Sequence, residues 1–394
     1  MHAARADRIR TTPLSFAPPA LGDEERANVA RSLDTGWLTS GPFVAQLETE
    51  LGEYLETPHA FAVSSCTTAM HLALVALGIG PGDEVVTTPL TWPATANVVA
   101  QTGATPVFAD VDPHTLQLDP AAVEAALTEH TRAVMPVHYA GHPCDVAALE
   151  TLCARHGLYL VEDAAHAVET RVDGGRKVGS IGDATCFSFY ANKNLAAGEG
   201  GALCVRDDAL ADRVRSLRLH GLDRDAWKRY EKAGPGAYDV IEPGYKYNLS
   251  DLHAGVALGQ LHRLEAHHAR RAQQVALYDE GLAGLDGIEA IGRRLADGAR
   301  HAWHLHVVRI DAALAGADRD AYATALAAER VGTGLHFLPV HRLTWYRERN
   351  RGLSLPHAEL AGSQVLSLPL SPAHSLDDIE DAIAAVRRVH ARLR

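Results

Sequence analysis

An alternation of short strand-like runs and helical patterns between residues 61 and 205 constrains the fold of this chain more than any other feature. The runs are apolar and favour strands, and the segments between the earlier runs repeat apolar residues at helical spacing. This rhythm is typical of parallel strands joined by helices that cover both faces of one sheet. We therefore predict an α/β fold with a mostly parallel, seven-stranded sheet. The predicted strands are 61–63, 84–88, 106–109, 133–137, 158–161, 184–189 and 202–205, and the predicted helices are 67–78, 93–102, 119–128 and 145–156.

The flanking segments predict a second, smaller unit. A turn-rich stretch at 36–42 leads into an amphipathic helix. After His220-Gly221, residues 249–285 have the pattern of one long helix, 305–310 that of a strand and 376–394 that of a terminal helix. We place a large cofactor-binding α/β domain at 1–245, including the N-terminal segment. A long connecting helix and a smaller α+β domain occupy 246–394.

Charge and cysteine content exclude several classes of protein. The net charge of -12 and the pI near 6.0 argue against a surface for nucleic acid or anionic membranes. The five cysteines form no C-x-x-C pair and no metal-binding spacing, so we expect neither a disulfide framework nor a metal. The basic segment Met1–Thr12 lacks an apolar signal core, and no run of about 18 apolar residues occurs. These features predict a cytoplasmic protein.

Lys193 is the strongest candidate for a catalytic residue. It follows the apolar run that begins at Cys186 and precedes a glycine-rich turn that ends at Gly201. A lysine just past the end of a strand reaches into a cleft, where desolvation lowers its pKa and leaves a neutral, nucleophilic amine. Taken alone, a lysine in such a position is more often a surface residue of a loop.

Asp163 and His166 follow the apolar run 158–161, at the edge where open α/β sheets bind ligands. An aspartate there can keep a pyridine nitrogen protonated and so make the ring an electron sink. Helix capping or a turn explains Asp163 equally well. His166 either contacts a cofactor oxygen or packs beside the strand.

The segment Ser64–Ala69 follows the first strand and opens an apolar helix. Backbone N–H groups and hydroxyls at such a helix start suit a phosphate, although a cap without a ligand is the commoner case. The chain has no P-loop motif, and Gly78-Ile-Gly80-Pro-Gly82-Asp83 fails the dinucleotide fingerprint. Trp92 follows a strand, where its indole either stacks on an aromatic cofactor or packs in the core.

Together these segments resemble the DegT/DnrJ/EryC1/StrS sugar aminotransferases, which are fold-type I enzymes dependent on pyridoxal 5'-phosphate (PLP). The likeness runs from Gly36-Trp-Leu-Thr-Ser-Gly-Pro42 to Leu366-Ser-Leu-Pro-Leu370. Within the family the chain looks most similar to UDP-4-amino-4-deoxy-L-arabinose aminotransferases. The segments that carry this closer likeness are 136–141, 162–168, 243–249, 301–305 and 332–337. The stretch Leu338-Pro-Val-His341 departs from the arabinose enzymes.

The resemblance implies a role for each matching residue. Lys193 forms the Schiff base with PLP, Asp163 pairs with the pyridine nitrogen and His166 contacts the ring hydroxyl. The remaining implied contacts are Cys66, Thr67, Thr68 and Ser188 at the phosphate, Trp92 on the ring, Asn248 at the phosphate of a neighbouring subunit's cofactor, and Trp37 and His336 at the sugar. The resemblance thus implies a homodimer with shared active sites and no metal.

The implied reaction is a ping-pong transfer of an amino group from glutamate to C4 of a nucleotide-linked 4-keto-sugar, with Lys193 moving the proton. We expect a UDP-4-keto-pentose, and the alternative is a dTDP-4-keto-6-deoxyhexose. A 3-dehydratase of this fold has histidine in place of the lysine, so Lys193 argues against it. A non-catalytic PLP-binding homologue is a further alternative. A cysteine desulfurase needs a cysteine near the C-terminal part, whereas the last cysteine is Cys204.

Overall fold

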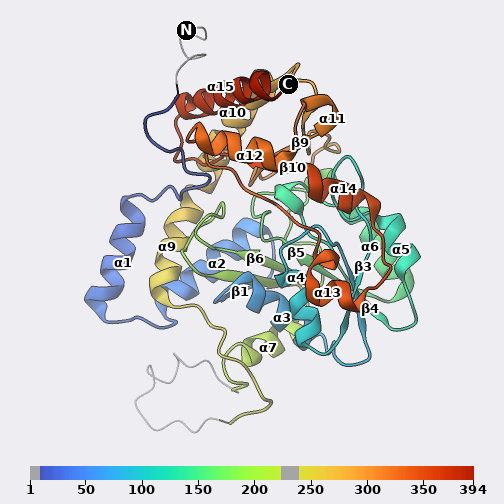
Figure 1. The fold of residues 1–394 in the computed structure, drawn as a ribbon. Helices are drawn as coiled ribbons and strands as arrows, with labels where there is room; N and C mark the ends of the chain where they lie inside the picture. Colours follow the sequence, from blue (N-terminus) through green and yellow to red (C-terminus); the bar gives the residue numbers. More distant parts are fainter. Residues whose placement is uncertain (1–8, 223–238) are drawn as a thin grey trace.

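The computed structural model describes residues 9–222 and 239–394, and its largest element is a seven-stranded sheet (Figure 1). The strand order is β1-β7-β6-β5-β4-β2-β3. All neighbours from β3 to β6 are parallel, and only β7 runs antiparallel to its two neighbours, β6 and β1. The strands are β1 (His59–Val63), β2 (Glu84–Thr87), β3 (Thr105–Phe108), β4 (Thr131–Met135), β5 (Tyr159–Asp163), β6 (Ala184–Ser188) and β7 (Gly201–Val205). The predicted mostly parallel sheet is confirmed.

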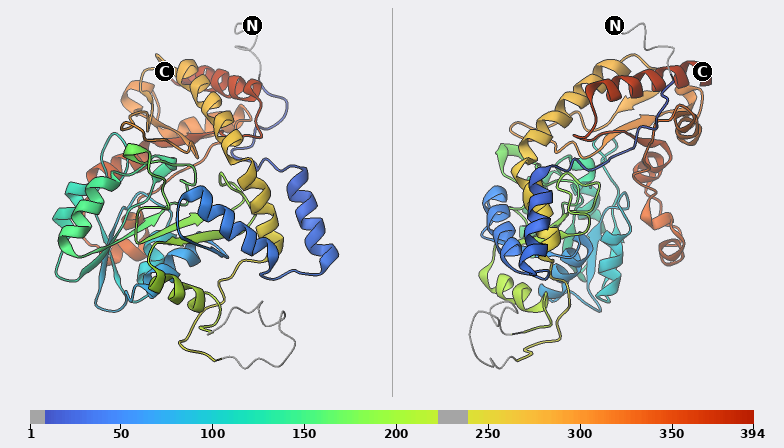
Figure 2. Two further views of the ribbon diagram at one scale, coloured as in Figure 1. Left: turned by 180° about the vertical axis from the view of Figure 1, so that it is seen from behind. Right: turned by 90° about the vertical axis from the view of Figure 1, so that its left-hand side faces the viewer.

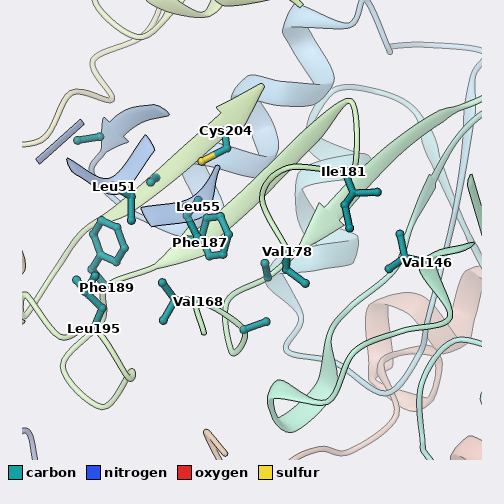
Figure 3. Close-up of a cluster of buried hydrophobic side chains, with 14 of the residues drawn as sticks. Leu51, Leu55, Val146, Val168, Val178, Ile181, Phe187, Phe189, Leu195 and Cys204 are labelled. Carbon is teal, nitrogen blue, oxygen red and sulfur yellow. The ribbon is translucent and has the colours of Figure 1, made fainter. Parts of the chain in front are cut away.

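Helices cover both faces of this sheet, as the alternating pattern predicts (Figures 1 and 2). One face packs on α3 (Cys66–Ala76), α4 (Ala94–Gln101) and α7 (Asp208–Leu217). The opposite face packs on α2 (Pro42–Leu55), α6 (Val146–His156) and α9 (Asp251–His262), with α5 (Pro120–Ala126) at its side. Figure 3 shows the second of these cores, in which Leu51 and Leu55 of α2 lie near Phe187 of β6. The sheet is therefore the middle of three layers.

A second, three-stranded antiparallel sheet lies near the C-terminal end of the chain, in the order β10-β9-β8 (Figure 2). It contains β8 (Ile288–Ala290), β9 (His306–Ile310) and β10 (Val365–Leu368), and its core includes side chains of α10 (Leu264–Leu282), α12 (Arg319–Ala328) and α15 (Leu376–Leu393). Three shorter helices lie between β9 and β10 in the sequence: α11 (Ala312–Ala315), α13 (Thr344–Arg349) and α14 (Pro356–Gln364). Leu14, from the N-terminal segment, packs in this core. The helix α9, by contrast, packs in the core on one face of the large sheet. The division at 245/246 remains a prediction.

Two features differ from the sequence-based prediction. The expected single helix over 249–285 is interrupted at Arg263, which ends α9 and precedes α10. The guanidinium of Arg263 donates to Ala20 O (3.0 Å) and to Glu25, so this residue is tied to the N-terminal segment. The helix α1 (Asp23–Thr35), which contains Glu25, was not expected. Its buried residues are the polar Glu25 and Ser32, so its pattern gave no apolar stripe.

The first residue of α9 caps a different helix. The start of α2 has no side-chain cap of its own, because its N-cap is Gly41. The buried carboxylate of Asp251 accepts hydrogen bonds from the backbone N–H groups of Gly41 (2.8 Å), Phe43 (3.2 Å) and Val44 (2.9 Å). Asp251 thus satisfies donors that a helix start leaves without intrahelical partners.

Residues 1–8 of the basic segment Met1–Thr12 lie outside the described residues. Over 9–222 and 239–394, none of the helices combines the length and apolar character that a bilayer crossing requires.

Asp251→Ala should lower the free energy of unfolding by about 2–3 kcal/mol, because it removes the charged acceptor of three buried N–H groups. Urea unfolding of the purified chain measures this. Asp145→Ala is the matched control, since Asp145 caps α6 through Ala148 N–H alone (3.1 Å) and should cost about 1 kcal/mol. Equal losses in both variants would contradict a capping role of Asp251 across two helices.

Candidate active site

A cavity of about 460 Å³ opens at the carboxyl ends of the parallel strands. Its wall includes the start of α3, the segment before α4, the end of β5, the β6–β7 connection and residues 335–337. The predicted site residues that line it are Cys66, Thr67, Trp92, Asp163, His166, Ser188, Lys193 and His336. Residues that are far apart in the sequence therefore meet at the edge that the strand pattern predicts.

Lys193 lies in the connection between β6 and β7. These strands are antiparallel neighbours, so the chain reverses at the edge of the sheet instead of crossing over a face. The N–H of Lys193 donates to Tyr190 O (2.9 Å), which forms a turn within the connection. Burial lowers the pKa of the Lys193 amine to about 8, although the nearby Asp163 carboxylate opposes this shift. A substantial fraction of this amine is therefore neutral near physiological pH.

Asp163 is the last residue of β5 and faces the cavity. Its Oδ2 accepts from the Thr95 hydroxyl (2.8 Å), and its Oδ1 accepts from the Ala165 N–H (3.1 Å). The Cys66 thiol lies 3.8 Å from Oδ1. Burial raises the pKa of Asp163, while the two donors and Lys193 lower it. A cationic group placed against this carboxylate would relieve the cost of its burial.

The start of α3 presents its backbone to the cavity. Ser65 caps the helix, since its Oγ accepts from Thr68 N–H (3.1 Å) and its carbonyl from Ala69 N–H (3.0 Å). The N–H groups of Cys66 and Thr67 precede the first intrahelical bonds and are directed out of the helix. Gly201 allows this turn to pack on β7, because a Cβ there would lie 2.6 Å from Cys66 N. An anion is favoured at such a helix start.

His166 carries its proton on a defined nitrogen. The N–H of Ala140 donates to Nδ1 (3.3 Å), so the proton of the neutral ring lies on Nε2. Burial holds the pKa of His166 well below its usual value, and Lys193 and His304 add to this effect. The ring of Phe337 is stacked at 6.0 Å and that of His304 lies at 4.2 Å. His166 is therefore a neutral donor whose ring contacts two other rings.

Trp92 and His336 stand at the wall of the cavity. The Trp92 side chain is 65% exposed, and its ring lies 6.2 Å from that of Phe337. His336 Nδ1 lies 2.9 Å from Ser367 Oγ, and burial lowers the pKa of His336 to about 4. The cavity thus combines an exposed indole with a neutral imidazole.

Three predicted residues do not line this cavity. The hydroxyl of Thr68 points to Ser65, where it completes the helix cap. Asn248 Nδ2 donates to Ser40 Oγ (2.6 Å), and the Trp37 indole donates to Ser40 O (3.0 Å). Asn248 and Trp37 belong to two segments that meet at Ser40, and their predicted roles remain predictions.

The sequence-based prediction did not single out several residues around the cavity. Thr95 bonds to Asp163 and also lies 2.8 Å from the Thr91 hydroxyl. The available signal was the presence of two threonines four residues apart, one just before α4 and one in its first turn. Phe337 is adjacent to His336 but carries no polar group that would have drawn notice. In the described part of the chain, no cluster of three or more His, Cys, Asp and Glu side chains is arranged to hold a metal.

The arrangement suits an anionic aromatic ligand that reacts with amines. The start of α3 favours an anion at one end of the cavity, and Asp163 favours a cation at the other. Lys193 supplies a partly neutral amine between them, and Trp92 supplies an exposed aromatic face. Together these groups can bind and orient such a ligand and move a proton on it.

Comparison with known proteins identifies one family, which agrees with the resemblance found in the sequence. The model of the DegT/DnrJ/EryC1/StrS aminotransferase family matches residues 19–387. The spore coat polysaccharide biosynthesis protein SpsC of Bacillus subtilis (strain 168) is 47% identical over 379 residues, which cover 95% of this chain and 97% of SpsC.

Two solved structures are similar over nearly the whole chain. DesV of S. venezuelae, solved in complex with a ketimine intermediate, is 39% identical with a TM-score of 0.84, and the match covers 93% of this chain and 94% of DesV. DesI, solved in the presence of its TDP-sugar product, is 34% identical with a TM-score of 0.87, and the match covers 98% of this chain and 94% of DesI. This chain belongs to the DegT/DnrJ/EryC1/StrS family of PLP-dependent sugar aminotransferases.

Proposed function

We propose that the protein transfers an amino group from glutamate to C4 of a nucleotide-linked 4-keto-sugar, with a UDP-4-keto-pentose as its substrate. The observation that carries this proposal is the meeting of Lys193, Asp163 and the start of α3 in one cavity. Family membership supports the amino transfer. The choice of donor and sugar rests on the resemblance to the arabinose enzymes.

The residues of the cavity fit PLP. Asp163 is a buried carboxylate that forms no ion pair at contact distance among the described residues, and a protonated ring nitrogen would provide one. The N–H groups of Cys66 and Thr67, with the hydroxyls of Thr67 and Ser188, are suited to a phosphate at the other end. The backbone contact at Gly201 keeps this helix start against the sheet.

PLP, when bound, supplies an aldehyde that condenses with amines and a ring that delocalises an electron pair. Lys193 Nζ is proposed to take up a proton and return it, which suits an amine with a pKa of about 8. Asp163 holds a proton at the ring nitrogen, and His166 Nε2 donates to the ring hydroxyl. Trp92 covers one face of the ring and excludes water from it.

We further propose that the protein is a homodimer with shared active sites. Asn248 lies outside the cavity of its own chain, where Lys246 Nζ and Ser40 Oγ hold its amide. From this position Asn248 is proposed to exchange its contact with Ser40 for the phosphate of a neighbouring subunit's cofactor. Trp37 in the adjacent segment and His336 in the cavity wall are proposed to contact the sugar.

A dTDP-4-keto-6-deoxyhexose is the second candidate substrate. DesI, a relative with 34% identity, was solved with its TDP-sugar product. Leu338, two residues after His336 of the cavity wall, is half exposed and belongs to the stretch that departs from the arabinose enzymes. This wall therefore has a sequence that is compatible with an additional methyl group on the sugar.

The residue at position 193, an absorbance assay and the cysteine positions each separate the proposed activity from one rival. A 3-dehydratase of this fold is implied to carry histidine at the position of Lys193. A non-catalytic homologue would bind PLP without consuming glutamate, so bleaching of its absorbance band by glutamate distinguishes the two. A cysteine desulfurase would need a cysteine near the C-terminal part. The five cysteines here are all buried thiols, and none of them follows Cys204.

Lys193→Ala should bind PLP non-covalently and lose turnover by several orders of magnitude. In the wild type, the rate of PLP capture by apoprotein should rise with pH through about 8, because only the neutral amine attacks an aldehyde. Stopped-flow absorbance measures the capture. Lys177→Ala is the control, since Lys177 lies outside the cavity beside Tyr54. Near-normal turnover of Lys193→Ala would contradict the assignment.

Asp163→Asn should reduce kcat far more than it reduces stability, because the amide no longer keeps the ring nitrogen protonated. Glu162→Gln is the matched control on the same strand. Its carboxylate faces the opposite layer, where it bonds to His138 (2.9 Å) and Thr185 (2.8 Å), so this variant should lose mainly stability. If Asp163→Asn unfolds or keeps full activity, Asp163 is a turn residue only.

The sugar preference should be graded. Exclusion of one methyl group by packing supplies about 1–3 kcal/mol, which corresponds to roughly 10–200-fold in kcat/KM. The measurement is kcat/KM for 4-amino-pentoses and 4-amino-6-deoxyhexoses on the same nucleotide, run in reverse with 2-oxoglutarate. A clear preference for the 6-deoxyhexose would replace the pentose proposal and leave the role of Lys193 intact.

A further inference from the structure

A buried ion pair lies behind the turn that carries Lys193. Glu169 follows β5 in the loop after His166, and Arg271 belongs to α10. Each is 2% exposed, and Arg271 Nη2 donates to Glu169 Oε1. The pair thus joins the loop after β5 to α10, a helix that packs on the three-stranded sheet.

The second oxygen of Glu169 holds the residue next to Lys193. Asn194 Nδ2 donates to Glu169 Oε2 (2.7 Å) and to Ala302 O (2.9 Å). Because this nitrogen faces two acceptors, Asn194 Oδ1 is left to accept from His304 Nδ1 at 3.1 Å. Every polar atom of the buried Asn194 side chain therefore has a partner, and the partners come from two other segments of the chain, the loop at Glu169 and residues 302–304.

Asn194 adjoins Lys193 in sequence, and Arg271 and His304 lie near it in space. A second cavity, of about 20 Å³, is lined by Lys193, Asn194, Arg271 and His304. His304 also packs against His166, with ring centroids 4.2 Å apart. Lys193 thus lines both cavities, and Arg271 of the ion pair lines the smaller one with it.

Stability alone does not account for such a pair. Desolvation of two charges costs several kcal/mol, and replacing a buried pair by apolar groups of similar volume is often neutral or stabilising. A carboxylate that also fixes an amide has a use that apolar groups cannot provide. In this structure the fixed amide belongs to the residue that follows Lys193.

We propose that Glu169 and Asn194 are positioning residues for Lys193. Glu169, held by Arg271, fixes Asn194, and Asn194 fixes the turn so that the Lys193 amine stays desolvated in the larger cavity. This role rests on the proposed function of Lys193. Release of Asn194 would let the turn move and admit water to the amine.

Two double variants separate this role from a purely structural ion pair. Both E169Q/R271M and E169M/R271M remove the charges and keep the side-chain volumes close to those of the wild type. Only glutamine at 169 leaves an oxygen that can accept from Asn194 Nδ2. Any difference between the two variants therefore reports on the contact to Asn194.

The first measurement is the pH midpoint of PLP capture by apoprotein. It should stay near the wild-type value of about 8 in E169Q/R271M. In E169M/R271M it should rise by about one unit toward the ordinary value for lysine, a 10-fold change in the protonation equilibrium. In E169M/R271M, kcat should fall on the order of 100-fold with little change in KM. Urea unfolding should give similar stabilities for both variants.

Equal capture midpoints in the two double variants would overturn the positioning role while leaving the proposed function intact. If the wild type itself fails to capture PLP, the proposed function fails instead. Should either double variant not fold, Asn194→Ala tests the same contact with the Glu169–Arg271 pair left in place. An unchanged capture midpoint in Asn194→Ala would also overturn the proposal.

Discussion

Because both faces of the large sheet are covered, successive residues of each strand must serve different layers. Glu162 and Asp163 show the consequence most clearly. Glu162 points into the layer of α2 and α6 and pairs with His138, whereas Asp163 points toward the start of α3 and the cavity. A shift of one residue in the register of β5 would exchange these two environments. The chemistry of the site thus depends on the same alternation that builds the core.

The sequence predicted the elements whose signal is local. All seven strands of the large sheet were expected within a few residues of their bounds, because apolar strand runs between turns are read directly from the chain. Lys193, Asp163 and His166 were singled out for the same reason, since each follows such a run, and the structure brings all three to one cavity. The position of α3 in the sequence was also predicted, from the polar residues that open an apolar helix.

Features that depend on distant partners could not be predicted. The helix α1 buries Glu25, which bonds to Gln260 and Arg263, so its buried face has no apolar periodicity. The same contact accounts for the missed interruption at Arg263. Asn194 appeared as a neighbour of Lys193 only, because its partners Glu169 and His304 lie elsewhere in the sequence.

Two contacts between segments far apart in the sequence complete the large sheet and its covering helix, and they affect the order in which the chain folds. The edge strand β1 is hydrogen-bonded to β7, and the start of α2 is capped by Asp251. During synthesis, the N-terminal strand therefore leaves the ribosome long before its partner exists, and α2 leaves it before its cap does. Contacts of such large sequence separation slow folding and prolong the exposure of an unpaired edge. The nascent chain consequently stays vulnerable to association with other chains until more than half of it has been translated.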